Sequence, residues 1–248
     1  TPPGPRMKEV ARQYQAMATK LAVTPEQIVD QGRAGMIRKT PVTAEDPARG
    51  PVDAPHELIV FSDFLCPACA RLSGVIERIE AAWPGAVRVV FKHLPLELRC
   101  NARIDAKQDL HKGACRAAKL AEAAFRVGGN DAFWRMHDVM MRDPSLAKQG
   151  DYASVARLAG LDLAALEAMA EDSGVAARID STIGQAPTIV HPEDPARRVV
   201  PFTPILLFDG RWITQWAMYT RVTANGPSTM RRRLGCGRCC WAIQASRR

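Results

Sequence analysis

The sequence predicts an α/β fold, because a strand, a helix and a second strand follow one another in the first half of the chain. Residues 57–62 centre on a continuous apolar run, which is typical of a strand buried on both faces. Apolar residues then recur at helical spacing over residues 72–83, and Pro84 and Gly85 end that helix. The apolar run over residues 87–91 predicts the second strand. A helical crossover between two strands implies parallel pairing, and therefore a layered α/β architecture.

Size and composition allow one such domain together with additional segments. The chain has 248 residues, of which 47% are hydrophobic, so it can bury a full core. No apolar run reaches the roughly 18 residues that a membrane-spanning helix needs, and no secretory hydrophobic segment is present. Because the chain begins at Thr1 rather than at Met, we expect it to be processed or cropped.

The formal net charge of +8 is concentrated at the C-terminus. After Asp209 the chain contains eight basic residues and no acidic one, so residues 1–210 hold 26 basic and 26 acidic side chains. The body of the protein is therefore neutral, and its charge does not predict nucleic acid as a partner.

Two segments are expected before the α/β domain. Apolar residues from Met7 to Leu21 recur at spacings of three and four, and Thr24 begins a second short helix as its N-cap. We interpret residues 1–39 as a helical arm that packs or tethers, in preference to a dedicated partner-binding helix. Residues 40–55 contain four prolines among small and charged residues, which predicts a proline-rich linker.

The compact domain is expected over residues 56–218, with an almost wholly helical insertion over about 112–185. Within the insertion the expected helices are residues 114–127, a helix capped by Asn130 or Asp131, residues 151–159, and residues 162–172 with Asp162 as the N-cap. A β-hairpin is expected after the insertion, with strands at 205–208 and 212–214 and a turn at Asp209 and Gly210.

The motif Cys66-Pro67-Ala68-Cys69 lies where the first strand gives way to the helix. Unpaired N–H groups at a helix N-terminus favour the thiolate, so this position indicates redox chemistry. The alternatives are a structural zinc half-site or two inert buried thiols. Zinc needs four ligands, and no second pair of ligands lies nearby in sequence, so the redox interpretation is favoured.

Four sequence blocks in this order resemble the DsbA-like thiol:disulfide oxidoreductases, which have a thioredoxin-like fold with a helical insertion. The blocks are Phe61-Ser62-Asp63-Phe64-Leu65-Cys66-Pro67-Ala68-Cys69, Phe91-Lys92-His93-Leu94-Pro95-Leu96, His111-Lys112-Gly113-Ala114-Cys115-Arg116-Ala117-Ala118 with the following Ala121-Glu122-Ala123-Ala124, and Phe202-Thr203-Pro204. The resemblance covers about residues 50–216 and is much more specific than an isolated CxxC motif.

The resemblance implies that Cys66 is the exposed nucleophile and Cys69 the more buried resolving thiol. Exchange would pass through a mixed disulfide between Cys66 and a protein client, without a cofactor. Pro67 and Ala68 supply no cation to the thiolate, so we expect a less oxidising potential than that of relatives with a histidine beside the second cysteine. Val60 stands where many thioredoxin-fold enzymes keep a buried acid that moves protons.

The resemblance also implies that Thr203 and Pro204 form a cis-proline loop against the dithiol, where the Thr203 backbone binds an extended client strand. The alternative is an ordinary proline opening an edge strand. Asp63 is close to the dithiol in sequence, but its orientation is left open. Lys92 and His93 are interpreted as surface residues at a strand end; the alternative places them close to the dithiol.

Cysteines similar to Cys100 and Cys115 form a second disulfide in DsbA-like relatives; the alternative is two separate buried thiols. Such a bridge would be structural, would stabilise the fold by about 3 kcal/mol, and would indicate an oxidising compartment.

The last part of the chain, residues 219–248, is rich in Arg and Cys and fits no expected element. We considered a metal-binding or second redox site at the three cysteines there, and a basic patch for nucleic acid or a membrane surface. The composition favours a disordered or non-native tail outside the fold. The three cysteines are Cys236, Cys239 and Cys240.

The sequence therefore predicts a thiol:disulfide oxidoreductase that acts on protein clients outside the cytoplasm, in a bacterial periplasm or tethered to a membrane facing it. The resemblance implies a membrane quinone-linked partner that recycles the dithiol. Two alternatives from other classes are a thioredoxin-fold peptide-binding or holdase module, and a metal-binding module that uses the C-terminal cysteines.

Overall fold

The computed structural model describes residues 40–106, 109, 111–191, 194–200 and 202–213. The arm expected over residues 1–39 and the tail over 219–248 lie outside these residues. The described elements, in chain order, are β1 (Ala48–Arg49), β2 (His56–Ser62), α3 (Pro67–Ala82), β3 (Val87–His93), α4 (Ala114–Arg142), α5 (Pro144–Gln149), α6 (Tyr152–Ala159), α7 (Leu163–Ala170), α8 (Ser173–Gln185), β4 (Ile189–His191), β5 (Asp194–Val199), β6 (Ile205–Phe208) and β7 (Arg211–Ile213).

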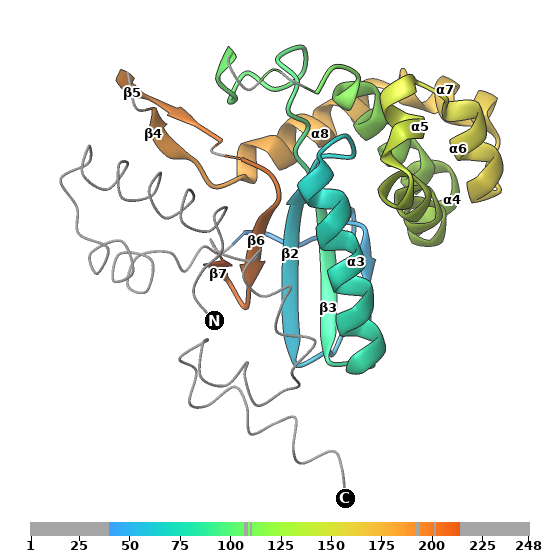
Figure 1. The fold of residues 1–248 in the computed structure, drawn as a ribbon, viewed down its shortest axis with the longest axis horizontal. Helices are drawn as coiled ribbons and strands as arrows, with labels where there is room; N and C mark the ends of the chain where they lie inside the picture. The colour runs from blue at the N-terminus through green and yellow to red at the C-terminus, as the bar shows by residue number, and fades with distance from the viewer. Residues whose placement is uncertain (1–39, 107–108, 110, 192–193, 201, 214–248) are drawn as a thin grey trace, which may run out of the picture.

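A five-stranded mixed sheet in the order β1-β3-β2-β6-β7 forms the centre of the domain. Strands β2 and β3 are parallel, with Leu58 opposite Val89, as the crossover predicts. Strand β6 runs antiparallel to β2 and forms the expected hairpin with β7. The helices α4 to α8 are inserted between β3 and β6, so the architecture is a thioredoxin-like fold with a helical insertion (Figure 1).

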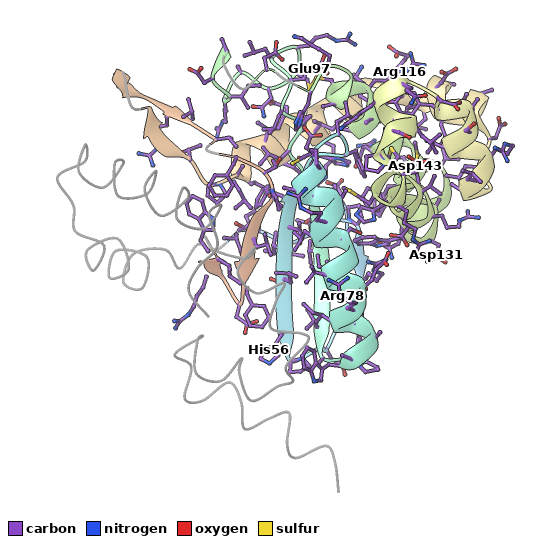
Figure 2. All side chains as sticks on the ribbon, viewed as in Figure 1. His56, Arg78, Glu97, Arg116, Asp131 and Asp143 are labelled. Atoms are coloured by element: carbon purple, nitrogen blue, oxygen red, sulfur yellow. A yellow bond between two sulfur atoms is a disulfide. The ribbon has the colours of Figure 1, made fainter. Side chains whose placement is uncertain are left out.

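The sheet separates two apolar layers because successive side chains of a strand point to opposite faces. From β2, Leu58 and Val60 belong to the cluster that includes buried residues of α3 and α4. Ile59 and Phe61 belong to a second cluster with the apolar side of α8. Figure 1 shows α3 in front of β2 and β3 and helices α4 to α7 gathered beside the sheet, while α8 packs in the second cluster. Exposed charged side chains such as those of Arg78, Arg116 and Asp131 lie on the outside of the helices (Figure 2).

The helical insertion agrees with the sequence in most places. Helix α4 contains a break at Gly129, whose φ of 69° is left-handed, so it corresponds to the two helices expected there. Asp162 caps α7 by accepting a hydrogen bond from the Ala164 N–H at 3.0 Å. Asn130 has a different role from the expected cap: its side-chain amide exchanges two hydrogen bonds with the backbone of Ala48, at 2.8 and 2.7 Å.

Residues 40–55, predicted to be a linker, pack onto the domain. Residues Ala48 and Arg49 form β1, which pairs with β3. Asp46 is buried and forms ion pairs with the buried side chains of Lys92, at 2.6 Å, and of Arg178. The prolines are typical of a linker. Local composition does not reveal the ion pairs that hold this segment, because the partners of Asp46 lie 46 and 132 residues away in the chain.

The prediction that Lys92 and His93 are surface residues is wrong. Lys92 is 0% exposed and His93 is 2% exposed. Lys92 is buried because its ammonium group finds three partners: the Asp46 carboxylate, the Pro41 carbonyl oxygen at 2.8 Å and the Gln185 side chain at 2.9 Å. His93 lies in an aromatic cluster, 5.2 Å from the ring of Phe91. A cation at a strand end is ordinarily solvated, and only these distant partners reverse that expectation.

The small antiparallel pair β4–β5, which follows α8, was not expected from the sequence. In the part of the chain that the structure describes, no helix has both the length and the apolar character needed to cross a membrane.

Candidate active site

The two cysteines of the CxxC motif lie at the start of α3, just after the carboxyl end of the central strand β2. Cys66 is the N-cap residue of α3, and Pro67 follows at the first helical position, where its missing N–H would have no partner. Cys66 is 6% exposed and Cys69 is 2% exposed. Both cysteines are free thiols. The expectation that Cys66 is exposed is therefore wrong: it is buried, because the loop at Thr203 lies against it, and it is only slightly more accessible than Cys69.

The surroundings of the two thiols move their pKa values in opposite directions. A hydrogen bond from the Cys69 thiol lowers the pKa of Cys66 to about 6, against the effect of burial, with further help from Thr203 and from the N–H groups of Ala68 and Cys69. Burial and the neighbouring charge of Cys66 raise the pKa of Cys69 well above its ordinary value. Near neutral pH, the Cys66 thiol is therefore largely ionised, whereas Cys69 retains its proton.

The loop before β6 closes over Cys66. The Thr203–Pro204 peptide bond is cis, and the Cys66 thiol donates to the Thr203 carbonyl oxygen at 3.6 Å. The Thr203 hydroxyl is buried and has no other hydrogen-bond partner among the described residues, so it is free to donate to the Cys66 sulfur, whose pKa it lowers. Thr203 thus presents polar atoms to the sulfur from the opposite side of the site from α3.

Asp63, whose orientation the sequence left open, holds the loop around the cysteines. Its carboxylate accepts hydrogen bonds from the N–H of Leu65 at 2.6 Å and from that of Leu96 at 2.7 Å, and pairs with His111 Nδ1 at 2.9 Å. Its own backbone N–H donates to Cys69 Sγ at 3.5 Å. Asp63 is 1% exposed, so these contacts are formed away from bulk water.

His111 is a site residue that sequence reasoning did not assign. Its hydrogen bond to Asp63 raises its pKa, and the charge of Cys66 adds to this effect against partial burial. The charge of Cys66 favours the protonated form of His111, so a protonated His111 would in turn favour the Cys66 thiolate, which Pro67 and Ala68 cannot do. His111 is the first residue of the third block that carried the family resemblance, which is the signal that could have identified it.

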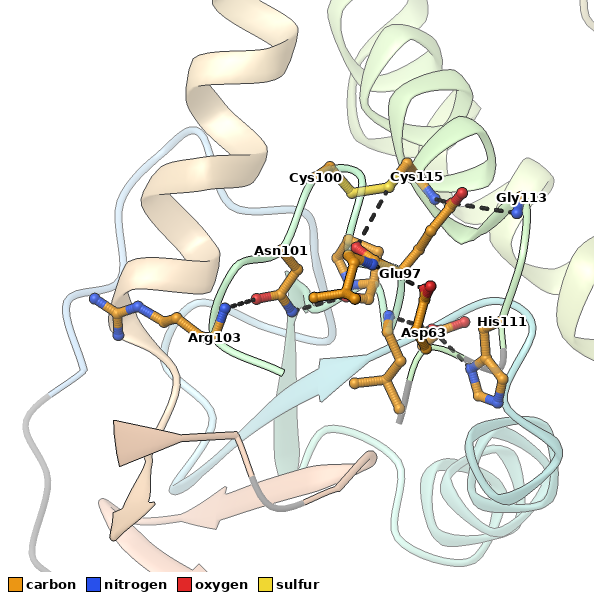
Figure 3. The surroundings of a disulfide bond; sticks show 12 residues. Asp63, Glu97, Cys100, Asn101, Arg103, His111, Gly113 and Cys115 are labelled. Atoms are coloured by element: carbon orange, nitrogen blue, oxygen red, sulfur yellow. Dashed lines mark hydrogen bonds and ion pairs between the residues drawn. A yellow bond between two sulfur atoms is a disulfide. The ribbon is translucent and has the colours of Figure 1, made fainter. Parts of the chain in front are cut away.

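Cys100 and Cys115 form a disulfide, with their Cα atoms 5.9 Å apart (Figure 3). The Glu97 carboxylate next to it accepts hydrogen bonds from the N–H of Gly113 at 3.2 Å and from that of Cys115 at 2.9 Å. Figure 3 shows this disulfide beside the Asp63–His111 pair. The bridge therefore fixes the start of α4 and the segment from which His111 projects.

No group of three or more His, Cys, Asp or Glu side chains with the arrangement of a metal site occurs within the residues that the structure describes. The cysteines of the alternative metal-binding hypothesis, Cys236, Cys239 and Cys240, lie outside those residues.

A thioredoxin-like fold with a CxxC dithiol at the start of its first long helix and a cis-proline loop opposite defines the class of this protein. Residues 57–189, more than half of the chain, match the DSBA-like thioredoxin domain. The chain belongs to that family, whose chemistry is thiol:disulfide exchange.

Solved structures share this fold. A thioredoxin-like oxidoreductase from Silicibacter pomeroyi DSS-3 is 20% identical, with a TM-score of 0.52 over 74% of this chain and 94% of its own. Oxidised BdbD from Bacillus subtilis is also 20% identical, with a TM-score of 0.53 over 76% of this chain and 95% of its own. At 20% identity, these similarities show a shared fold and nothing further.

Curated relatives at higher identity are larger proteins that are named as Na(+)/H(+) antiporters. A Na(+)/H(+) antiporter NhaA 3 from Salinispora tropica is 31% identical over 141 residues, which are 57% of this chain and 19% of the antiporter. An NhaA 1 from Salinispora arenicola is 32% identical over 118 residues, 48% of this chain and 16% of that protein. The chain thus spans about a fifth of the length of these relatives.

Proposed function

We propose that this protein exchanges disulfides with protein clients through Cys66 and Cys69. The observation that carries the proposal is the placement of two free thiols at one helix N-terminus against the cis-proline loop, where the pKa of Cys66 is lowered and that of Cys69 is raised. A sulfur that ionises near pH 6 is a ready nucleophile and a good leaving group, and a neighbouring thiol that keeps its proton does not compete with it for the client.

In the reducing direction the Cys66 thiolate attacks one sulfur of a client disulfide. A bond forms between Cys66 and the client, and the other client sulfur leaves as a thiolate. Cys69 then loses its proton and attacks Cys66, which releases the second client sulfur and leaves a Cys66–Cys69 disulfide. Two electrons have passed to the client. The oxidising direction is the same sequence reversed.

Client binding is assigned to Thr203 and Pro204. Their loop lies against Cys66. The backbone of Thr203 would bind an extended client strand through main-chain hydrogen bonds, as when a strand is added to a sheet. Main-chain recognition would accept many client sequences.

The direction of electron flow depends on how strongly the reduced form is stabilised. A Cys66 pKa of about 6 is lower than the value near 7 of thioredoxin and higher than the value near 3.5 of DsbA. We therefore expect a reduction potential between about −270 mV and about −120 mV, the values of those two proteins. Measurement in glutathione buffers tests this, and a value outside the interval contradicts it.

The setting is extracytoplasmic, in a bacterial periplasm or at a membrane facing it. The Cys100–Cys115 disulfide supports this, because such bonds persist in oxidising compartments. The dithiol requires a partner that recycles it, and we propose a membrane quinone-linked protein. Ion transport, the activity in the name of the curated relatives, is not proposed, since only about a fifth of their length is matched.

The experiment is refolding of a client with scrambled disulfides by the wild-type protein and by Cys66→Ala. The proposal predicts that the variant loses catalysis while it keeps its fold. Full activity in Cys66→Ala would instead support a holdase. Metal analysis of the purified chain, with and without Ser at the three tail cysteines, tests the metal-binding alternative, which stoichiometric zinc would favour.

A further inference from the structure

A small cavity lies against Cys69, and Cys66 does not line it. Its volume is about 20 Å³, and Cys69 lines it together with Val60, Ser62 and Arg49. A cavity must offer roughly 10–15 Å³ and two or more polar partners to hold a water molecule. This one meets both conditions, because two serine hydroxyls, a guanidinium and an imidazole line it beside the thiol.

The imidazole in that wall belongs to His137 of α4, a buried titratable group that the exchange steps have not used. His137 Nδ1 lies 2.8 Å from an Asp138 carboxylate oxygen. Burial acts against ionisation of Asp138, but the hydrogen bond from His137 and the charges of Arg49 and Arg142 outweigh it, so the pKa of Asp138 is lowered. An ionised carboxylate accepts from Nδ1–H, which leaves Nε2 as the basic nitrogen.

Beyond His137 the path continues to solvent. Arg49 donates to both carboxylate oxygens of Asp138 at 3.2 Å and also pairs with Glu80 at 3.0 Å. Arg49 and Asp138 are 24% and 21% exposed and line a surface groove on the outer side. The cavity at Cys69 is therefore connected to water by a short row of polar groups.

We propose that His137 carries the proton of Cys69, through one water molecule in this cavity. The proposal rests on the proposed function. When Cys69 attacks the mixed disulfide, its S–H bond breaks, an S–S bond to Cys66 forms and the client leaves as a thiolate. The proton passes to His137 Nε2 and from there to solvent; in the reverse reaction it returns to Cys69. His137 thereby takes the role of the buried, proton-moving acid that many thioredoxin-fold enzymes keep at the position of Val60.

The charges around His137 suit this role. Burial lowers the pKa of His137, so the ring is neutral and able to accept a proton near pH 7. Asp138 on the same helix and Glu77 on α3 stabilise the imidazolium once formed, whereas Arg49 on β1 opposes it and favours onward release of the proton.

The test follows Cys66 in the full-length reduced protein after mixing with oxidised glutathione. Acid-quenched samples are analysed by mass spectrometry, so that formation and resolution of the Cys66–glutathione adduct give separate rate constants. In His137→Gln we expect an unchanged formation rate and a resolution rate that is lower by about 100-fold at pH 6–7, a typical contribution of a proton carrier. The loss should shrink above pH 9, where hydroxide removes the proton instead.

Two further variants separate proton transfer from packing. Val60→Asp in the His137→Gln background places an acid in the same cavity and should restore most of the resolution rate. His93→Gln is the matched control, because His93 is buried in the same aromatic cluster as His137 but does not line the cavity. The His93→Gln variant should have a resolution rate within about twofold of the wild-type rate.

An unchanged resolution rate in His137→Gln, or an equal loss at every pH without rescue by Val60→Asp, would overturn the inference. An equal loss in His93→Gln would do so too. If His137→Gln fails to fold, Asp138→Asn provides the second variant: it weakens the basicity of His137, so resolution should slow in the same pH range, and an unchanged rate contradicts the inference. Absence of both the Cys66 adduct and the Cys66–Cys69 disulfide in the wild type would instead contradict the proposed function.

Discussion

The sulfur of Cys66 lies 3.6 Å from the main-chain oxygen of Thr203, although 137 residues separate them in the chain. This contact brings the start of α3 and the loop before β6 together on one sulfur. The nucleophile and the backbone proposed to bind the client are thereby held in one place, so that a bound client strand would pass directly over Cys66.

The reactivity of Cys66 should rise with pH around a midpoint near 6, because its pKa is lowered to about 6. Thr203→Val removes a hydroxyl beside the sulfur and should move the midpoint upward. The measurement is the alkylation rate of the Cys66 peptide by iodoacetamide between pH 4 and 10. A wild-type midpoint near 9, the ordinary value, would contradict this description of the site.

His111→Gln should raise the pKa of Cys66 and make the dithiol less oxidising, because the variant removes the cation that favours the thiolate. The same alkylation profile and the reduction potential measure this. Lys112→Gln is a suitable control, since Lys112 is adjacent but its side chain is 72% exposed and pairs with Asp109. An equal change in both variants would argue against a specific role for His111.

The His111–Asp63 pair should also affect stability in a pH-dependent way. The pKa of His111 is raised above its ordinary 6.5 in the folded state, so its contribution is complete below pH 6.5 and is lost as the pH rises through the raised value. We expect about 1 kcal/mol, since the His111 side chain is 18% exposed and its ion pair is partly screened by solvent. Urea unfolding of oxidised wild type and His111→Gln at pH 5.5 and 9 measures it; a difference that grows toward pH 9 contradicts the assignment.

Asp46→Ala should destabilise the protein by about 3 kcal/mol or more, because it leaves the buried cations Lys92 and Arg178 without their carboxylate. Urea unfolding at pH 7 gives the value. Glu45→Ala is the matched control: Glu45 also approaches Arg178, at 3.9 Å, but is 72% exposed and should contribute less than about 1 kcal/mol. Equal effects of the two variants would show that residues 40–55 are not anchored through Asp46.

Replacing both Cys100 and Cys115 by Ser should reduce the free energy of unfolding by about 3 kcal/mol, the value for a loop of this length. The alkylation midpoint of Cys66 should change little, as the bridge is assigned a structural role. Loss of client oxidation with unchanged stability would instead point to a relay of electrons through the second disulfide.

The sequence predicted the features that depend on local pattern. The crossover between residues 57–62 and 87–91, the cap at Asp162 and the hairpin after Ile205 are present. The features that it missed depend on contacts between distant segments. The buried ion pairs of Lys92 and the placement of His111 beside Asp63 arise only when the folded chain brings those residues together.

The most direct test of the proposed chemistry is to trap the mixed disulfide. In Cys69→Ser, with the three tail cysteines also replaced by Ser, Cys66 cannot be resolved and should accumulate a disulfide with an oxidised client peptide. We predict that mass spectrometry finds this adduct on Cys66 in nearly all molecules, and that Cys66→Ser in the same background gives none. An adduct that is absent from Cys66, or equally abundant in both variants, would contradict the assignment of Cys66 as the nucleophile.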